Sequence, residues 1–284
     1  MYAETGGRLP VFPAVYKQLP MKNNRYTLIT GASSGLGKEF ALQCAARGMN
    51  LILIALPGSN AASVANNLIF EYGIDVRVFE FDMTDSLMLL SKLHYIRANF
   101  EVDFLINNAG IGGTAAITES SLEAIDRILQ LNIRSMVLIT QTLLPLLLKQ
   151  EKSYILNISS MAAFTPIAYK TVYPASKAFI SSFSLGLREE LHDTPLSVSV
   201  VYPGPMMTNA GISTRIIGQG RKGRMGLLPT SEIVRVALKQ CLAGKALIIP
   251  GLWNQVNHRL MGIIPLGIKL RIISKAVKKE IAVK

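Results

Sequence analysis

The sequence predicts a doubly wound α/β fold, in which a parallel sheet of about seven strands carries helices on both faces. Half of the 284 residues are hydrophobic and 17% are charged, so the chain can build a large core. Short apolar segments alternate with amphipathic helical segments between residues 26 and 250, as in parallel sheets. A glycine-rich turn joins the first apolar segment to the first helical one.

The strands are predicted from short apolar runs that are bounded by turn-forming residues. Leu36, Phe40 and Cys44 recur at spacing four and predict the helix between the first two strands. Ser120 and Glu123 match a capping box, which predicts the start of the helix that precedes Asn132. The predicted strands are Thr27–Thr30, Leu51–Ala55, Val76–Phe81, Phe104–Ile106, Tyr154–Ile158, Ser197–Val201 and Ala246–Ile249.

Three segments are expected along the chain. Residues 1–25 are rich in glycine and proline and are expected to be an irregular extension, with Met21 as a natural start of the domain. Residues 26–250 are expected to form one catalytic domain, and residues 251–284 a basic amphipathic extension. The apolar run Met136–Leu148 is too short to span a membrane and predicts a buried helix.

Composition argues against several other classes of protein. Cys44 and Cys241 form no CxxC motif, and the three histidines are scattered, so neither a disulfide framework nor a metal site is indicated. A reducing, cytoplasmic setting fits this cysteine usage. The formal net charge is +12, with seven Lys or Arg and one Glu after residue 250. This asymmetry favours an acidic partner or an anionic membrane surface over a nucleic acid.

The glycine-rich turn has the features of a phosphate-binding site. Its sequence, TGASSGLG, starts at Thr30 and ends at Gly37, between a predicted strand and a predicted helix. Glycines let the backbone approach a pyrophosphate, and the helix N-terminus offers unpaired N–H groups. The alternative is a tight turn whose glycines serve packing alone.

The spacing of this turn is similar to the TGxxxGxG motif of the short-chain dehydrogenase/reductase family, which has a Rossmann-type fold. Five further motifs follow in the family's order, over residues 26 to 250: Asp82-Met83, Asn107-Asn108-Ala109-Gly110, Asn132, Ser160 with Tyr173 and Lys177, and the PGxxxT-like stretch Pro203–Thr208. The resemblance implies hydride transfer between a nicotinamide dinucleotide and a carbonyl or alcohol, with Asn132, Ser160, Tyr173 and Lys177 as the catalytic tetrad. It implies dinucleotide contacts from Gly31, Ser33, Ser34, Gly35, Leu36, Gly37, Asp82, Met83, Asn108, Ala109, Gly110, Tyr173, Lys177, Pro203, Gly204, Met206 and Thr208.

Tyr173 and Lys177 are four residues apart, so on a helix they share one face. A cation about 6 Å from a phenol contributes about 2.8 kcal/mol at an effective dielectric near 20. That interaction would bring the pKa of Tyr173 from about 10 to about 8, where a phenol can exchange protons. The alternative is a surface tyrosine beside a solvated lysine.

Ser160 follows a predicted strand, at the edge of the sheet where α/β proteins hold ligands, and its hydroxyl could stabilise a substrate oxygen. Ser159 is the rival, and the family spacing selects Ser160. By resemblance, Asn132 would order a water in a proton relay through Lys177. A polar residue that bends the helix between Leu131 and Ile133 is the alternative, and both can hold.

The chain departs from the family after the second strand, where an acid that favours NAD or a base that favours NADP is usual. Residues 54–60 contain neither, and Ser59 and Asn60 lie where a helix N-terminus could accept a 2′-phosphate. NADP is therefore the preferred cofactor and NAD the alternative.

The substrate is expected to be a small carbonyl or alcohol with an apolar body of acyl, lipid or steroid type. By resemblance to the family, the segment between Thr208 and Pro229 would cover the substrate, and it contains Arg215, Arg221, Lys222 and Arg224. Apolar walls are expected beneath this basic lid. The predicted wall residues are Met161, Phe164, Ile167, Met206, Met207 and Ile212, and all could instead be core. A dinucleotide-binding sensor and a membrane-associated scaffold remain as alternative functions on the same fold.

Two surfaces are predicted for contacts with partners. By resemblance to the family, Met136–Leu148 and the helix after Tyr173 would pair across a two-fold axis in a homodimer or homotetramer. From residue 268, Leu270, Ile273, Val277 and Ile281 form an apolar stripe with lysines around it. The stripe would lie in a membrane interface or would pack on its own domain or a sister subunit. This tail is similar in composition to the family branch with long-chain 3-oxoacyl and 3-ketosphinganine reductases.

Overall fold

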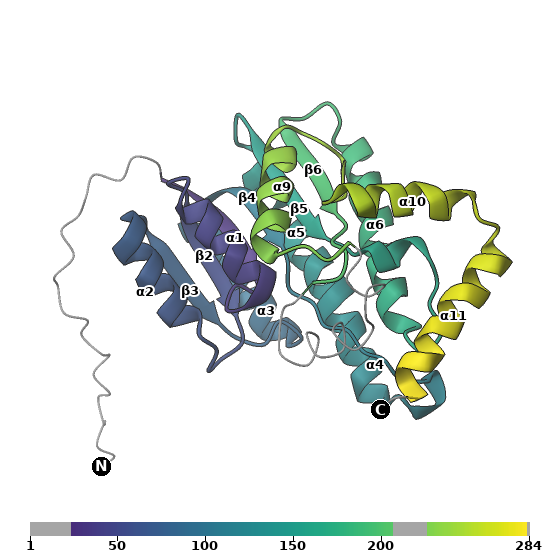
Figure 1. Ribbon diagram of the computed structural model, residues 1–284. Coiled ribbons are helices and arrows are strands. Elements are labelled where there is room, and N and C mark those ends of the chain that lie inside the picture. Colours follow the sequence, from purple (N-terminus) through teal and green to yellow (C-terminus); the bar gives the residue numbers. More distant parts are fainter. Residues whose placement is uncertain (1–23, 207–225, 283–284) are drawn as a thin grey trace, which may run out of the picture.

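A seven-stranded parallel sheet forms the centre of the molecule, with strand order β3-β2-β1-β4-β5-β6-β7. The computed structural model describes residues 24–206 and 226–282, apart from the side chains of 276 and 279–282. The strands are β1 (Arg25–Thr30), β2 (Asn50–Ala55), β3 (Val76–Glu80), β4 (Glu101–Asn107), β5 (Ser153–Ile158), β6 (Leu196–Val201) and β7 (Leu247–Ile248). The predicted doubly wound fold is confirmed (Figure 1).

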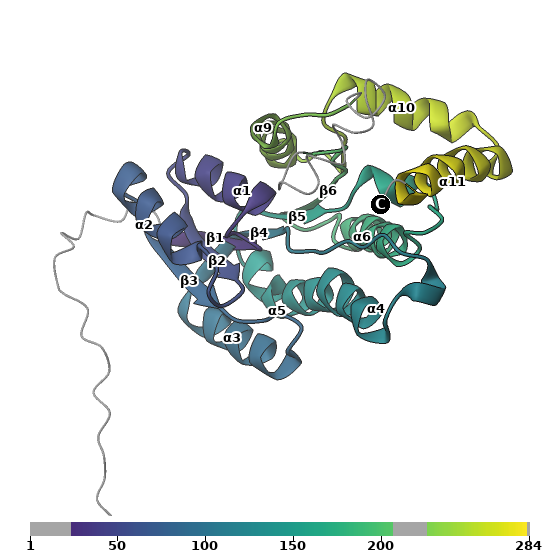
Figure 2. The same ribbon diagram turned by 60° about the horizontal axis from the view of Figure 1, so that its bottom comes forward.

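Helices cover both faces of the sheet, as Figure 2 shows. One face is covered by α1 (Gly35–Ala45), α2 (Ala61–Tyr72) and α9 (Thr230–Leu242), which enclose one hydrophobic cluster with the strands. The other face is covered by α3 (Ser86–Asn99), α5 (Met136–Leu148) and α6 (Val172–Glu190), around a second cluster. Short elements complete this part: η1 (Ile117–Glu119), α4 (Leu122–Leu129), η2 (Gln130–Ser135) and η3 (Met161–Phe164).

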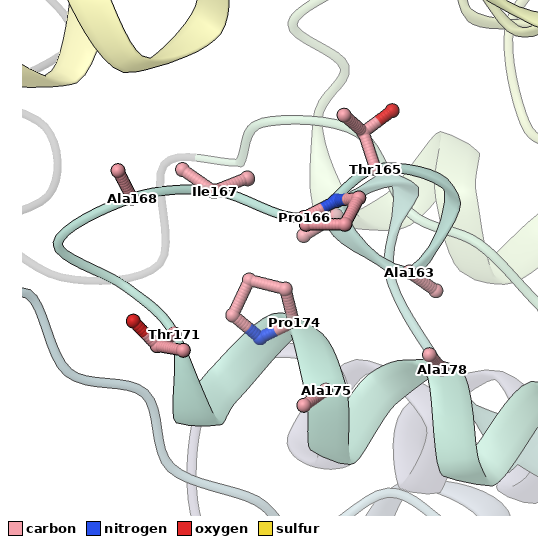
Figure 3. A pocket seen from close by; sticks show the side chains of 10 residues that line it. Ala163, Thr165, Pro166, Ile167, Ala168, Thr171, Pro174, Ala175 and Ala178 are labelled. Atoms are coloured by element: carbon pink, nitrogen blue, oxygen red, sulfur yellow. The ribbon is translucent and has the colours of Figure 1, made fainter. Parts of the chain in front are cut away.

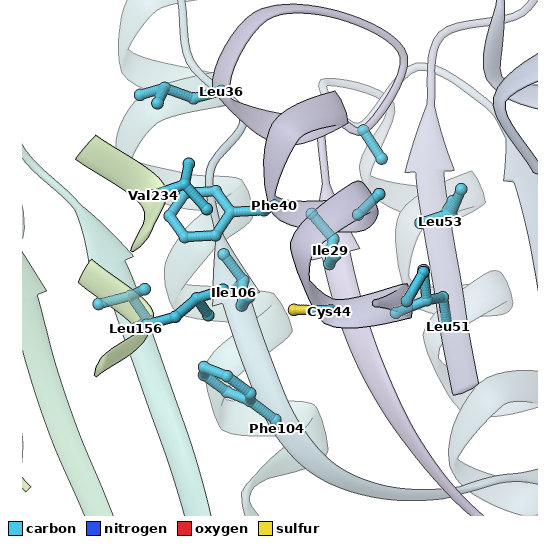
Figure 4. Close-up of a cluster of buried hydrophobic side chains, with 14 of the residues drawn as sticks. Ile29, Leu36, Phe40, Cys44, Leu51, Leu53, Phe104, Ile106, Leu156 and Val234 are labelled. Atoms are coloured by element: carbon cyan, nitrogen blue, oxygen red, sulfur yellow. The ribbon is translucent and has the colours of Figure 1, made fainter. Parts of the chain in front are cut away.

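The first cluster explains how α1 is fixed beneath the glycine-rich turn. Phe40 and Cys44 are fully buried one turn apart, and Phe40 packs beside Val234 of α9 (Figure 4). The spacing of four that predicted this helix is therefore its core face. Because α1 packs along its whole length, its N-terminal end is held rigidly at the edge of the sheet.

The helix α4 begins one residue later than predicted. Ser121 is its N-cap and accepts a hydrogen bond from the Ala124 N–H at 3.1 Å, whereas the Ser120 hydroxyl donates to the Ala116 carbonyl. Both serines are residue types that are preferred at a helix N-cap. Ser120 instead ends the preceding 3-10 turn η1 (Ile117–Glu119) as its C-cap, so Ser121 caps α4.

A π-helical turn, η2, connects α4 to α5 and places Asn132 near its centre. The three elements form a continuous helical run, Leu122–Leu148, that is long and apolar enough to cross a membrane by length and composition. Half of its most apolar window is buried, and α5 packs against α3 and β4. Met136–Leu148 is therefore a core helix, as predicted, although it is part of a longer run.

A set of hydrogen bonds joins the carboxyl ends of β1 and β4, where the chain order of the sheet reverses. The Thr30 hydroxyl oxygen accepts hydrogen bonds from the backbone N–H groups of Asn108 and Ala109, both at 3.0 Å. The Asn108 amide donates back to the carbonyls of Thr30 and Gly31, at 2.9 and 3.3 Å. This clamp fixes the glycine-rich turn against the loop after β4.

Replacing Thr30 by Val is expected to lower the free energy of unfolding by about 1–3 kcal/mol, because two backbone donors lose their shared acceptor. Thr27→Val is the matched control in the same strand, since the Thr27 hydroxyl faces only the weak acceptor Met49 Sδ at 3.7 Å. Urea unfolding of both variants measures the difference. Equal stabilities would show that the clamp is not a stabilising element.

Candidate active site

The predicted catalytic residues converge at the carboxyl edge of the sheet. Ser160 follows β5, Tyr173 and Lys177 lie on the first turns of α6, and Asn132 lies in η2. Tyr173 is hydrogen-bonded to Ser160, and the Lys177 Nζ lies 5.8 Å from the centre of the Tyr173 ring. Residues that are separated by up to 45 positions in sequence therefore form one cluster around the phenol.

Lys177 is the most constrained member of this cluster. Its side chain is 4% exposed, and its Nζ donates a hydrogen bond to the Ile158 carbonyl at 2.9 Å, at the end of β5. No carboxylate pairs with it among the residues that the structure describes. Burial therefore lowers the pKa of Lys177 to about 8.

Burial also decides the state of Tyr173, and the expectation of a pKa near 8 is wrong for this form of the protein. Burial raises the pKa of the Tyr173 phenol above 10, and the hydrogen bond with Ser160 lowers it by less. The sequence argument counted the attraction to a lysine but not the removal of the phenol from water. Tyr173 is thus held protonated in this site, as a proton donor must be.

The two candidate serines have different roles. The Ser159 hydroxyl is buried and donates to the Lys177 carbonyl at 2.8 Å, so it holds α6 against β5. Ser160 caps η3, accepts a hydrogen bond from the Ala162 N–H at 3.1 Å and lies beside Tyr173. The structure therefore supports the choice of Ser160 as the serine of the site.

Asn132 joins the loop after β4 to the catalytic helix. Its amide oxygen accepts from the Ile111 N–H, and its amide nitrogen donates to the Ile111 carbonyl, both at 2.9 Å, and to Ser176 Oγ at 3.0 Å. Ser176 lies between Tyr173 and Lys177 in the chain and donates to the Tyr173 carbonyl at 2.7 Å. Asn132 thus lies in a π turn of its helix, as the structural alternative predicted, and links the loop at Ile111 to α6. Its role in a water-mediated relay through Lys177 stays a prediction.

Gly110 leaves little room for a side chain because it lies close to two site residues. A Cβ built at this position would lie 3.1 Å from the Asn132 amide oxygen and 3.3 Å from the Lys177 Nζ. The loop that carries Asn108, Ala109 and Gly110 therefore approaches the catalytic lysine as closely as a backbone can.

The glycine-rich turn has the geometry of a dinucleotide site. Ser34 is the N-cap of α1, but its side chain accepts no hydrogen bond, so the first N–H groups of the helix are left without a side-chain cap. Gly31 has φ +66°, and a Cβ on Gly37 would lie 2.0 Å from the Gly31 carbonyl oxygen. Gly35 and Leu36 open the helix, and Ser33 lies beside them, half-buried. This uncapped helix end fits a pyrophosphate.

The other predicted cofactor contacts lie along the same edge. Met83 is buried, and Asp82 accepts hydrogen bonds from the backbone N–H and hydroxyl of Thr84 while its second oxygen lies 3.6 Å from Arg127. Pro203 and Gly204 follow β6, where the Pro203 carbonyl accepts from the Met161 N–H, and Met206 packs on the first cluster. Thr208, Met207, Ile212 and the basic residues Arg215, Arg221, Lys222 and Arg224 lie outside the described residues.

Two residues near the site were missed in the sequence. The Ser59 hydroxyl donates to Glu80 at 3.4 Å, so an acid from the neighbouring strand β3 reaches the turn after β2 where none was expected. Only strand pairing brings these residues together, and no local motif signals it. Tyr169, in the loop between Ser160 and Tyr173, has φ 64°, a strained conformation for a residue with a side chain.

The expected apolar wall is divided between different surroundings. Phe164 stacks on Tyr202 with ring centres 4.4 Å apart and meets His258 at 4.0 Å, whereas Met161 is half-buried in the same small cluster. Ile167 lines a hollow of about 370 Å³ between its loop and α6 (Figure 3). The hollow is lined on α6 by Thr171, Pro174, Ala175 and Ala178, which share the helix face opposite Tyr173 and Lys177.

Comparisons with known proteins agree with this geometry. A family model described as short chain dehydrogenase matches residues 25–216. The chain is 33% identical over 182 residues to a very-long-chain 3-oxoacyl-CoA reductase from Anas platyrhynchos, covering 63% of this chain and 58% of that relative. An uncharacterized oxidoreductase from Staphylococcus saprophyticus is 31% identical over 186 residues, with 65% and 80% covered. The chain thus spans less than two thirds of the length of the 3-oxoacyl-CoA reductases that it matches.

Solved structures share the same fold. A 7beta-hydroxysteroid dehydrogenase structure has a TM-score of 0.80 at 20% identity, with 88% of this chain and 96% of that chain covered. A short-chain dehydrogenase from Sphingobium yanoikuyae in complex with NADPH has a TM-score of 0.72 at 28% identity, with 85% and 96% covered. At 20% identity, the likeness to the 7beta-hydroxysteroid dehydrogenase concerns the fold alone. The Sphingobium yanoikuyae enzyme has the same fold and is also more similar in sequence.

Replacing Tyr173 by Phe removes one hydroxyl and is expected to lower kcat by at least about a hundredfold, since general acid catalysis contributes about that much. Dinucleotide affinity should stay within about twofold, because the ring and its neighbours remain. Steady-state kinetics and fluorescence titration with the reduced dinucleotide measure both quantities. Retention of more than about a tenth of kcat would exclude Tyr173 as the acid.

The Lys177 ammonium loses its proton above a pKa of about 8. The value of kcat/KM for the reduced dinucleotide, which reports groups of the free enzyme, should therefore fall as the pH rises above about 8. In Lys177→Arg the guanidinium stays charged, so the kcat/KM that remains should no longer fall over that range. A flat profile in the wild type between about pH 7 and pH 9.5 would contradict this assignment.

Proposed function

The chain belongs to the short-chain dehydrogenase/reductase family, and we propose that it transfers hydride between a nicotinamide dinucleotide and a carbonyl or secondary alcohol. The observation that carries this proposal is the cluster of Ser160, Tyr173, Lys177 and Asn132 at the sheet edge beside the uncapped end of α1. A sensor on the same fold would not need a buried lysine next to a phenol, so this cluster favours an enzyme.

The chain's own residues divide the chemistry as follows. The dinucleotide, when bound, supplies or accepts the hydride. Tyr173 gives its phenolic proton to the carbonyl oxygen during reduction, and Ser160 donates a hydrogen bond to the same oxygen. Lys177 stabilises the negative charge that then develops on the phenol. This electrostatic attraction is stronger in the buried site than it would be in water. Asn132 is a positioning residue, which fixes the loop at Ile111 and the helix at Ser176.

The proposed substrate has an apolar body and is reduced. Met161 and Phe164 supply apolar side chains in the short helix η3, which begins directly after Ser160. Relatives named as very-long-chain 3-oxoacyl-CoA reductases support an acyl substrate, and the bulky-bulky ketone specific alcohol dehydrogenase from Comamonas testosteroni, 29% identical, supports a large ketone. A panel of such carbonyl compounds, followed by the loss of reduced-dinucleotide absorbance, tests the activity.

We further propose a homodimer or homotetramer in a reducing, cytoplasmic location at the inner face of a membrane. The outer face of α6 supports assembly, since Phe179 is 39% exposed and stacks on Phe183 next to the hollow at Ala175 and Ala178. The buried free thiols of Cys44 and Cys241 support the location. Light scattering at micromolar concentration and cell fractionation test these two points, and a monomer or a secreted protein would contradict them.

The preferred dinucleotide is proposed to be NADP. The uncapped N-terminal turn of α2 begins after Asn60 and has no acidic residue, so it can accept a 2′-phosphate. Glu80 weakens this preference, since its carboxylate lies at hydrogen-bond distance from Ser59. The wild type should therefore use NADPH with a higher kcat/KM than NADH.

Replacing Glu80 by Gln is expected to raise kcat/KM for NADPH by about fivefold, which corresponds to about 1 kcal/mol of relieved repulsion, and to leave NADH nearly unchanged. Glu189→Gln, at the exposed end of α6, is the matched control for the loss of one charge. A preference of the wild type for NADH would overturn the NADP proposal. An equal effect of both variants would remove Glu80 from the cofactor site.

A further inference from the structure

The C-terminal arm consists of α10 (Leu252–Ile263) and α11 (Leu266–Ala282), which extend from the end of the sheet beside α6 (Figures 1 and 2). The arm is anchored to the domain at its base. The Asn254 side chain is buried and donates to the carbonyls of Pro250 and Gly226, and Gln255 donates to the Ile249 carbonyl. His258 packs on Phe164 of η3. The arm is therefore fixed next to the segment that carries Ser160.

The apolar stripe that was predicted from residue 268 onward faces inward. Val277 is 8% exposed, and Leu270 and Ile273 are half-buried, whereas the side chain of Ile281 lies outside the described part. The structure thus favours packing for this stripe, which was one of the two alternatives. Because Leu270, Ile273 and Val277 are buried or half-buried, this stripe is not available for contact with a membrane.

A different apolar face of the arm is exposed. On α10, Leu252, Val256, Leu260 and Ile263 recur at spacings four, four and three, so they form one stripe on the side away from Asn254 and His258. Leu252 and Ile263 are each 81% exposed. On α11, Ile268 and Ile272 are four residues apart on the side opposite the inward stripe, with exposures of 53% and 54%, and with the α10 stripe they make up the outer face of the arm. An exposed apolar stripe of four side chains along one helix, as on α10, is unusual on a soluble monomer.

The charges around this face are all of one sign. The sequence has no Asp or Glu between residues 251 and 279. Exposed cations flank the outer face at Arg259 on α10 and at Arg271, Lys275 and Lys278 on α11. An occupant of this face must therefore offer an apolar layer together with negative charges. Two helices with apolar stripes and flanking cations are typical of an anionic lipid surface.

A second copy of the chain fits the same face poorly. Two arms placed face to face would bring their cations together, and the whole chain carries a net charge of +12. We propose that the outer face of the C-terminal arm docks on an anionic membrane surface, with the α10 stripe in the acyl boundary and the α11 cations at the phosphates. Since α10 contacts η3, docking places the Ser160 end of the sheet close to the lipid. This proposal does not depend on the proposed activity.

Vesicle binding of the full chain tests this proposal. The protein should sediment with vesicles of phosphatidylcholine and phosphatidylserine, and much less with phosphatidylcholine alone. Replacing Leu252, Leu260 and Ile263 together by Ser should weaken the partition coefficient by at least about tenfold, because their apolar area stays in water. Replacing Arg271 and Lys275 by Gln should reduce binding at low salt and have little effect at high salt.

The matched control replaces Phe70 and Leu87 by Ser, since these side chains are 94% and 84% exposed on α2 and α3 and lie away from the arm. Circular dichroism and reduced-dinucleotide binding report whether each variant is folded. Equal vesicle binding by the arm variant and the control would overturn the proposal. Wild-type protein that sediments with neither kind of vesicle would also overturn it. So would light scattering that shows loss of self-association in the arm variant alone, together with unchanged lipid binding.

Discussion

The clamp between Thr30 and the Asn108 loop is the interaction on which the rest of the site depends. After β1 the chain turns into α1 on one face of the sheet, whereas after β4 it leads to the helices of the other face. Adjacent parallel strands that diverge in this way open a crevice, which is where α/β proteins bind ligands. Four hydrogen bonds across the two strands fix the walls of that crevice. The same loop then delivers Gly110 to Lys177 and Asn132.

A buried polar chain ties the catalytic elements together behind this crevice. Asn107 of β4 donates to Thr140 of α5 and to Asn157 of β5, which in turn donates to Ser184 of α6. Asn132 lies in the π turn that leads into α5, and Tyr173 and Lys177 lie at the start of α6, so these hydrogen bonds help to set the distance between the site residues. The buried ammonium of Lys177 costs stability, because its removal from water disfavours the charged form and lowers its pKa. The fold therefore holds the Lys177 ammonium in a buried position that is unfavourable for a charged group.

Much of the fold and the site follows from local signals in the sequence. Apolar runs predicted the strands because buried parallel strands such as β2 consist mostly of apolar residues. Tyr173 and Lys177 were predicted from their shared helix face and Ser160 from its place after a strand, whereas Asn132 was predicted from the resemblance to the family alone. Three features depended on tertiary packing and could not be predicted: the raised pKa of Tyr173, the approach of Glu80 to Ser59, and the direction of the two apolar faces of the arm. Periodicity predicts that a helix has an apolar face, but burial decides which face meets the domain.

The central claim is that the Tyr173 site performs hydride transfer and does not only sense a dinucleotide. The most direct measurement uses reduced dinucleotide that is deuterated at C4 of the nicotinamide, together with an apolar ketone, and mass spectrometry of the product. The account predicts an alcohol that carries deuterium on its carbinol carbon, formed by the wild type and lost in Tyr173→Phe. Tight dinucleotide binding without any labelled alcohol from the panel of ketones and acyl compounds would contradict it.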